Sequence, residues 1–126
     1  MQKQKDILDN FSEKFPLLDR LYELYKQTSE VSKNDENTLR KSAEITTLEI
    51  LELVVIATRQ AKAEKSQTLR QAVRKLDTLK VFVDMAKGLQ TMKEEKYEQI
   101  QESLSSVGKM LGGWLKSASA STSNAK

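Results

Sequence analysis

Basic side chains spaced three and four positions apart are the residues of this chain best suited to bind a ligand. Arg59 and Lys62 are three positions apart and Arg70 and Arg74 four apart, so each pair would share one face of a helix. Convergent guanidinium and ammonium groups attract phosphate, and each phosphate contact adds affinity that depends on salt but not on base sequence. A nucleic-acid backbone is therefore the first candidate ligand. The candidate contacts are Arg59, Lys62, Lys65, Arg70, Arg74 and Lys75.

The positive charge of the chain is local. Residues 57–80 carry seven Lys and Arg side chains against Glu64 and Asp77, which gives +5, whereas the whole chain carries only +3. No aromatic residue interrupts this segment, so it offers no platform for stacking bases. The alternative interpretation is a solvated surface that only keeps the protein soluble.

The residue types present argue against an enzyme. The chain has neither His nor Cys, which excludes thiol nucleophiles, Ser-His-Asp triads and haem ligation by histidine. Glu44, Glu49 and Glu52 lie close in sequence, but carboxylate-bridged metal sites in helix bundles also use His, so we expect these glutamates to be solvated or paired with lysines. No glycine-rich phosphate loop is present. We predict no catalytic activity, no metal and no cofactor.

Two further absences bear on location. The chain has no cysteine, which fits a reducing compartment, and it has no apolar run near the roughly 18 residues that a membrane span needs. We therefore expect a cytoplasmic protein that does not enter a membrane.

The elements that must position the basic residues are helices. One proline, four glycines and abundant Leu, Lys, Glu, Gln and Ala favour helix nearly throughout, and no segment alternates apolar and polar residues as a strand would. The apolar periodicity predicts an all-α protein, an antiparallel up-down-up-down four-helix bundle. Residues 1–116 would form this domain, and the small polar residues 117–126 a disordered tail. The predicted helices span about residues 6–28, 38–62, 66–90 and 94–116.

One helix boundary and one burial pattern carry specific expectations. The first helix begins at either Asp6 or Pro16, because Pro16 can kink a helix or occupy its first turn. The middle of the second helix is apolar on more than one side, so we predict it to be the most buried element.

Two features suggest contact with another molecule. Phe82, Met85 and Leu89 widen the apolar stripe of the third helix, either for another subunit or for a broad internal core. Gly112 and Gly113 each cost about 1 kcal/mol relative to alanine inside a helix, which indicates either a close approach by another backbone or a frayed end. Trp114 can stack on a base or a partner, or close the end of the bundle.

Three segments resemble a known family. The runs LRQAVRKLDTLKVFVDMAKGLQTM, KYEQIQESLSSVGKMLGGWLKS and TLEILELVVIA are similar to the accessory variability determinant (Avd) proteins of diversity-generating retroelements. This group belongs with the four-helix-bundle proteins of 23S rRNA intervening sequences. The most specific pieces are KLDTLK at residues 75–80 and GKMLGGWLKS at residues 108–117. Many relatives carry a Phe-Pro-Lys-x-x-Arg-Tyr stretch before the second helix, of which VSKNDEN here keeps only Lys33, and this favours the retroelement branch.

The resemblance implies a non-catalytic subunit that forms a barrel-shaped homopentamer. Such a protein would associate with the reverse transcriptase of its element and with template RNA or cDNA, and so support mutagenic cDNA synthesis and retrohoming. The basic segment would then serve RNA or the RNA-bound polymerase. Phe82, Met85, Leu89, Gly112, Gly113 and Trp114 would serve the contact between subunits. The alternative is a structural interaction module of the intervening-sequence type with no role in nucleic-acid binding.

Overall fold

The computed structural model describes residues 16–29 and 38–124, and these form four α-helices and no strand. The helices are α2 (Pro16–Thr28), α3 (Thr38–Ala57), α4 (Lys62–Gly88) and α5 (Glu94–Asn124). The predicted all-helical class and the four helices are thus confirmed for this part of the chain. Pro16 is the first residue of α2, a position where its missing N–H is not needed. The alternative start at Asp6 and the stretch 31–37 with Lys33 lie outside the described residues.

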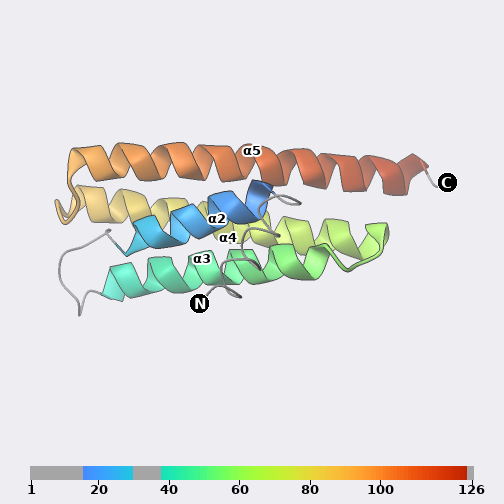
Figure 1. Cartoon of the computed structure of the whole chain (residues 1–126), viewed down its shortest axis with the longest axis horizontal. Coiled ribbons are helices and arrows are strands. Elements are labelled where there is room, and N and C mark those ends of the chain that lie inside the picture. Colours follow the sequence, from blue (N-terminus) through green and yellow to red (C-terminus); the bar gives the residue numbers. More distant parts are fainter. Residues whose placement is uncertain (1–15, 30–37, 125–126) are drawn as a thin grey trace, which may run out of the picture.

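Each helix packs against two others. α2 and α4 both lie between α3 and α5, and they do not contact each other in the part of the chain described. The chain runs back and forth along the long axis, from right to left in α2 and α4 and from left to right in α3 and α5 (Figure 1). The turn between α3 and α4, which carries the basic flanks, therefore lies at the right end of this view.

The core runs along the axis between the four helices. Every helix contributes a stripe of apolar side chains at spacings of three and four, as the periodicity predicts. Burying one Leu or Ile fully is worth about 1.5–3 kcal/mol, so this stripe dominates the stability of the fold. The largest side chains without solvent contact include Leu21, Leu24, Ile50, Leu69, Leu76, Leu79, Ile100, Leu104 and Leu111.

The outer face of α3 is exposed, which corrects the prediction that this helix is the most buried element. Ile45, Leu48 and Ile56 are 58%, 45% and 39% exposed, whereas Ile50 and Val54 on the opposite side are fully buried. A helix with two neighbours covers only part of its circumference. The apolar residues on the remaining face of α3 are therefore left uncovered by the described part of the chain.

The turn between α3 and α4 lies earlier in the sequence than predicted, at residues 58–61 instead of 63–65. α3 ends at Ala57 because the last turn tightens, with N–H groups of Arg59 and Gln60 donating to carbonyls three residues back at 3.0 and 3.3 Å. α4 begins already at Lys62, four residues before the expected start near Ser66. Ser66 lies inside the helix, where its hydroxyl donates to the Ala63 carbonyl at 3.2 Å.

The turn between α4 and α5 closes with a Schellman motif. The N–H of Thr91 donates to the carbonyl of Ala86 at 3.1 Å, and that of Gln90 to Lys87 at 2.9 Å. This geometry places Gln90 in the left-handed region at φ 59°. Glycine is the usual residue there, but the nearby Gly88 lies two residues earlier, inside α4.

Polar side chains join α4 to α5 beside this turn. The Tyr97 hydroxyl donates to Asp84 at 2.8 Å, and the Gln101 amide donates to the same carboxylate oxygen at 3.2 Å. Lys87 pairs with Glu94 at 3.2 Å and lies 4.2 Å from the centre of the Tyr97 ring. These contacts hold the first turns of α5 in register with the end of α4.

α5 continues to Asn124, beyond its expected end near Lys116. Residues 117–124 are therefore helical, where we predicted a disordered tail. The continuation is favoured because the segment contains no glycine or proline, and Ala118 is buried against the core.

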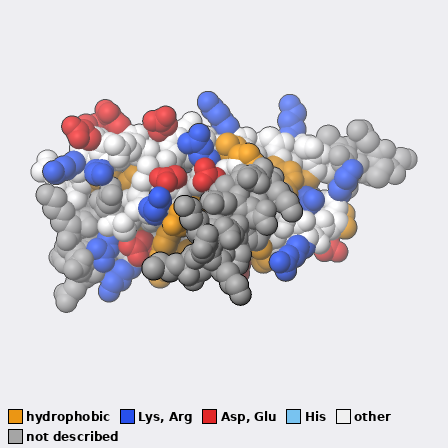
Figure 2. Space-filling view, in the orientation of Figure 1, with side chains coloured by type: hydrophobic (Ala, Val, Ile, Leu, Met, Phe, Trp, Pro, Cys, Tyr) orange, Lys and Arg blue, Asp and Glu red, His pale blue; other side chains and the backbone are white. Residues whose placement is uncertain are grey.

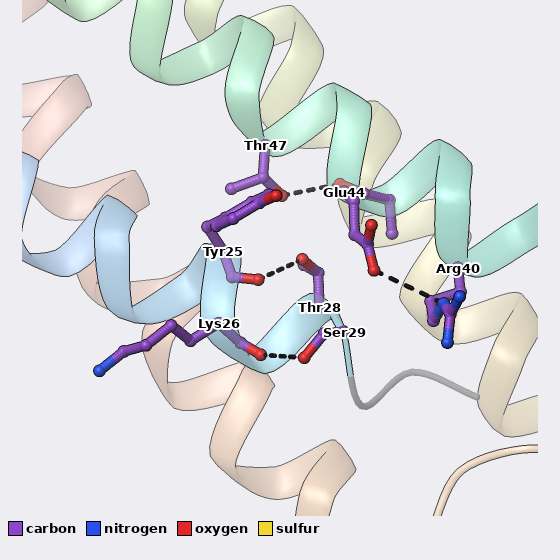
Figure 3. A network of polar contacts seen from close by, with 8 residues as sticks. Tyr25, Lys26, Thr28, Ser29, Arg40, Glu44 and Thr47 are labelled. Carbon is purple, nitrogen blue, oxygen red and sulfur yellow. Dashed lines mark hydrogen bonds and ion pairs between the residues drawn. The ribbon is translucent and has the colours of Figure 1, made fainter. Parts of the chain in front are cut away.

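Hydroxyl groups satisfy the backbone where α2 ends beside the start of α3 (Figure 3). Thr28 and Ser29 donate to the carbonyls of Tyr25 and Lys26, both at 2.6 Å. The buried Thr47 hydroxyl likewise donates to Ala43 at 2.8 Å. A polar group in the core without such a partner would cost about 1–3 kcal/mol.

The left-handed conformation of Gln90 in the α4–α5 turn predicts the effect of a glycine substitution. Replacing Gln90 with Gly removes the penalty of a left-handed L-residue, about 1 kcal/mol, and should raise the free energy of unfolding by about that amount. Urea denaturation monitored by circular dichroism measures the change. Gln90→Ala is the matched control and should not stabilise, since it keeps a Cβ. A Gln90→Gly variant less stable than wild type would contradict the assigned turn.

The Tyr97–Asp84 contact predicts a pH dependence. The hydrogen bond to Asp84 raises the pKa of Tyr97, with burial adding to the effect. A raised folded-state pKa means that the contact stabilises below the ordinary tyrosine value near 10 and is lost as pH rises through the folded value. Tyr97→Phe should therefore destabilise by about 1 kcal/mol at pH 8, and by less at pH 11. An equal difference in unfolding free energy at both values would argue against the contact.

Candidate nucleic-acid and partner interface

The turn between α3 and α4 positions most of the predicted basic residues. Arg59 belongs to the turn itself, Lys62 begins α4, and Arg70 and Arg74 follow on that helix; all four are exposed. Because α4 rises about 1.5 Å per residue, the cations from Lys62 to Lys75 extend over about 20 Å. They form an elongated surface that starts at one end of the bundle.

Two of the six predicted residues are engaged within the protein. Lys75 pairs with Glu49 of α3 at 3.4 Å, and Lys65 lies 5.7 Å from the centre of the Trp114 ring. Arg70 donates only to the neutral Gln67 side chain, at 3.4 Å. Arg59, Lys62 and Arg74 form no ion pair with any described residue. The structure thus separates exposed cations, namely Arg59, Lys62, Arg70 and Arg74, from two with structural partners.

Charge also divides α5 along its length. Carboxylates gather over the first half of α5 and basic side chains over the second half, at upper left and upper centre to right of Figure 2. The exposed residues are Glu94, Glu95, Glu98 and Glu102, followed by Lys109 and Lys116. The basic half of α5 extends toward the same end of the bundle as the α3–α4 turn (Figure 1). Lys109 and Lys116 are not among the predicted contacts, although they flank Trp114 in the sequence.

The three apolar residues proposed from α4 are accessible to different degrees. Met85 is 50% and Leu89 64% exposed, and Phe82 is half-buried. The broad internal core that would otherwise account for the wide stripe does not include these three side chains. Exposed large apolar residues on adjacent turns are typical of a surface that contacts another molecule.

The glycines and the tryptophan lie in different surroundings. Gly112 and Gly113 are both exposed, and a Cβ at either position would meet nothing within 4 Å. Trp114 is half-buried, packs against the core and carries Lys65 over its ring. Trp114 thus has the position expected of a side chain that closes the end of the bundle. The backbone at Gly112, in contrast, is accessible to a partner.

The described residues offer neither a metal site nor a membrane span. No cluster of three or more acidic residues there could hold a metal ion. Within the same residues, no helix is both long and apolar enough to cross a bilayer.

Comparison with known proteins places this arrangement in a family. No curated protein and no solved structure gives a significant match to the chain. The sequence model of the bAvd-like family, however, matches residues 11–118, which include all of α2, α3 and α4 and most of α5. This range covers the turn with its basic flanks as well as both glycines. The chain therefore belongs to the bAvd-like family.

Proposed function

We propose that this protein is a non-catalytic accessory subunit of a diversity-generating retroelement. In this role it binds the element's reverse transcriptase and nucleic acid, either template RNA or cDNA, and supports mutagenic cDNA synthesis and retrohoming. Membership of the bAvd-like family supports the general assignment. We further propose that it acts in the cytoplasm without a metal or cofactor.

The observation that carries the nucleic-acid role is the exposed set of cations at and after the α3–α4 turn. Arg70 and Arg74 lie four residues apart on one exposed face of α4, and neither pairs with a carboxylate of the described residues. Two like charges at this spacing repel each other slightly in the free protein. An approaching phosphate backbone relieves that repulsion and releases counterions. Arg59 and Lys62 extend the same electrostatic surface around the turn.

Self-association is part of the proposal. We propose that up-down-up-down bundles of this chain assemble into a barrel-like homo-oligomer, a homopentamer by resemblance to the Avd proteins. The exposed Met85 and Leu89 and the open backbone at Gly112 support a contact between subunits. A ring of copies would repeat the basic surface several times, so weak contacts to one RNA would add together.

A second candidate function is a structural interaction module of the 23S rRNA intervening-sequence type. The exposed apolar side chains of α3 and α4 favour it, since they suit protein partners and not phosphate. In that case the cations around the turn would be only a solvated surface. Binding of RNA distinguishes the two functions.

Charge reversal tests the nucleic-acid role. We expect Arg70→Glu with Arg74→Glu to leave the helical circular dichroism spectrum unchanged, because both side chains are exposed, while weakening binding to a single-stranded RNA. The slope of log affinity against log salt should fall by about 0.7 per lost phosphate contact. Fluorescence anisotropy at several salt concentrations measures both quantities.

The matched control is Lys41→Glu with Lys93→Glu, which changes the net charge equally at exposed positions outside the proposed surface. This control should lose much less affinity. Equal losses of RNA affinity in both double variants would show that net charge alone causes the effect. Unchanged affinity in the arginine variant would remove these residues from the mechanism and favour the second candidate function.

A further inference from the structure

A groove with a volume of about 390 Å³ lies between α4 and α5. Gly108 and Gly112 line its α5 side and Leu76 its α4 side, while Lys80 and Lys109 flank it. Lys80 is 3.9 Å from Asp77, and Lys109 forms no ion pair with a described residue. The groove thus combines an apolar interior with a rim of two lysines and the carboxylate of Asp77, so that Lys109 is the lysine of the rim without a paired carboxylate among the described residues.

The two glycines of the groove differ in how closely other atoms of the same protomer approach them. A Cβ at Gly108 would be 3.5 Å from Leu76 Cδ2, which is ordinary contact distance, while a Cβ at Gly112 would meet nothing within 4 Å. Packing within one copy therefore gives no reason for glycine at 112, where it weakens the helix by about 1 kcal/mol relative to alanine. An occupant that approaches the α5 backbone from outside does give a reason.

The outer face of α3 has the complementary properties. Ile45, Leu48 and Ile56 project from it at helical spacings, and the exposed Glu52 lies among them without an ion pair to any described residue. Leu48 and Glu52 are four positions apart, about 6 Å along α3, and Gly112 and Lys109 are three positions apart, about 4.5 Å along α5. Apolar projections with a carboxylate on one surface match an apolar groove with lysines on the other.

One copy of the chain cannot join these two surfaces. α3 lies diagonally opposite α5 and contacts α2 and α4 instead. The outer face of α3 therefore points away from the groove of its own bundle. The match can form only between copies.

We propose that the outer face of α3 of one copy seats in the α4–α5 groove of a second copy. Ile45 and Leu48 then cover the backbone at Gly112, and Glu52 approaches Lys109. The inference rests on the self-association included in the proposed function and names two surfaces that contribute to it, in addition to the exposed Met85 and Leu89. Because the two surfaces differ, the contact is head-to-tail, and repeating it gives a ring if the rotation closes.

A pair of glycine variants tests the groove. Gly112→Leu places a side chain in the groove, because Gly112 lines it, whereas Gly113→Leu places the same side chain outside the lining. A Cβ at either position meets no other atom of the protomer within 4 Å. Leucine favours helix over glycine at both positions, so each variant should fold at least as stably as wild type. By multi-angle light scattering, we expect wild type and Gly113→Leu to be oligomeric and Gly112→Leu to be a single copy. A monomeric wild type, or a Gly112→Leu protein that assembles normally, would overturn the proposal.

A charge exchange identifies the occupant of the groove. Glu52→Lys and Lys109→Glu should each weaken assembly about tenfold or more, and the two together on one chain should restore it, since opposite charges meet again between copies. Glu98→Lys, on the exposed acidic half of α5, is the matched control and should not be rescued by Lys109→Glu. Absence of rescue in the Glu52/Lys109 double variant would overturn α3 as the occupant and leave residues 1–15 or another protein to fill the groove.

Measuring RNA affinity on the same samples separates this inference from the proposed function. RNA binding that persists in an oligomer insensitive to these substitutions would refute the docking surfaces alone. Correct assembly without RNA binding would refute the nucleic-acid role alone.

Discussion

Each helix of this bundle has only two neighbours, and the remaining features of the surface depend on that geometric constraint. A single stripe on every helix is buried, so Leu76 and Leu79 of α4 and Leu104 and Leu111 of α5 meet along one axis. Side chains on the other side of a helix either face water or are covered by another molecule. α3 carries apolar residues on both sides, and the fold can bury only one of them.

The same constraint separates the functions proposed for the surface. Arg70 and Arg74 face water on α4, while Leu69 and Ala72 beside them in sequence are buried. Charge reversal at the arginines can therefore be tested without disturbing the core. The exposed apolar face of α3 and the groove between α4 and α5 are built from residues other than Arg70 and Arg74, although Val73 and Asp77 of the groove lie next to these arginines on α4.

Local pattern was sufficient to predict the helices, their approximate positions and most of the core, because apolar spacings of three and four survive into the structure as buried stripes. Helix ends were less predictable: the Schellman motif forces Gln90 into a conformation that its residue type disfavours, and the tightened turn ends α3 at Ala57.

The basic residues were visible in sequence, but their partners were not. Pairing of Lys75 with Glu49 depends on helix register, and the contact of Lys65 with Trp114 on packing at the bundle end. The groove beside Gly112 forms only where α4 and α5 pack together. Apart from its glycines, the sequence of neither helix predicts it.

The central claim is that this bundle works as an accessory subunit of a reverse transcriptase. Co-purification with a co-expressed reverse transcriptase of a diversity-generating retroelement, with and without nuclease treatment, tests that claim most directly. We predict that the two proteins purify together: retention after nuclease treatment would show a direct protein interface, and loss only after treatment would show that RNA links them through the basic surface. Failure to co-purify under either condition would contradict the account.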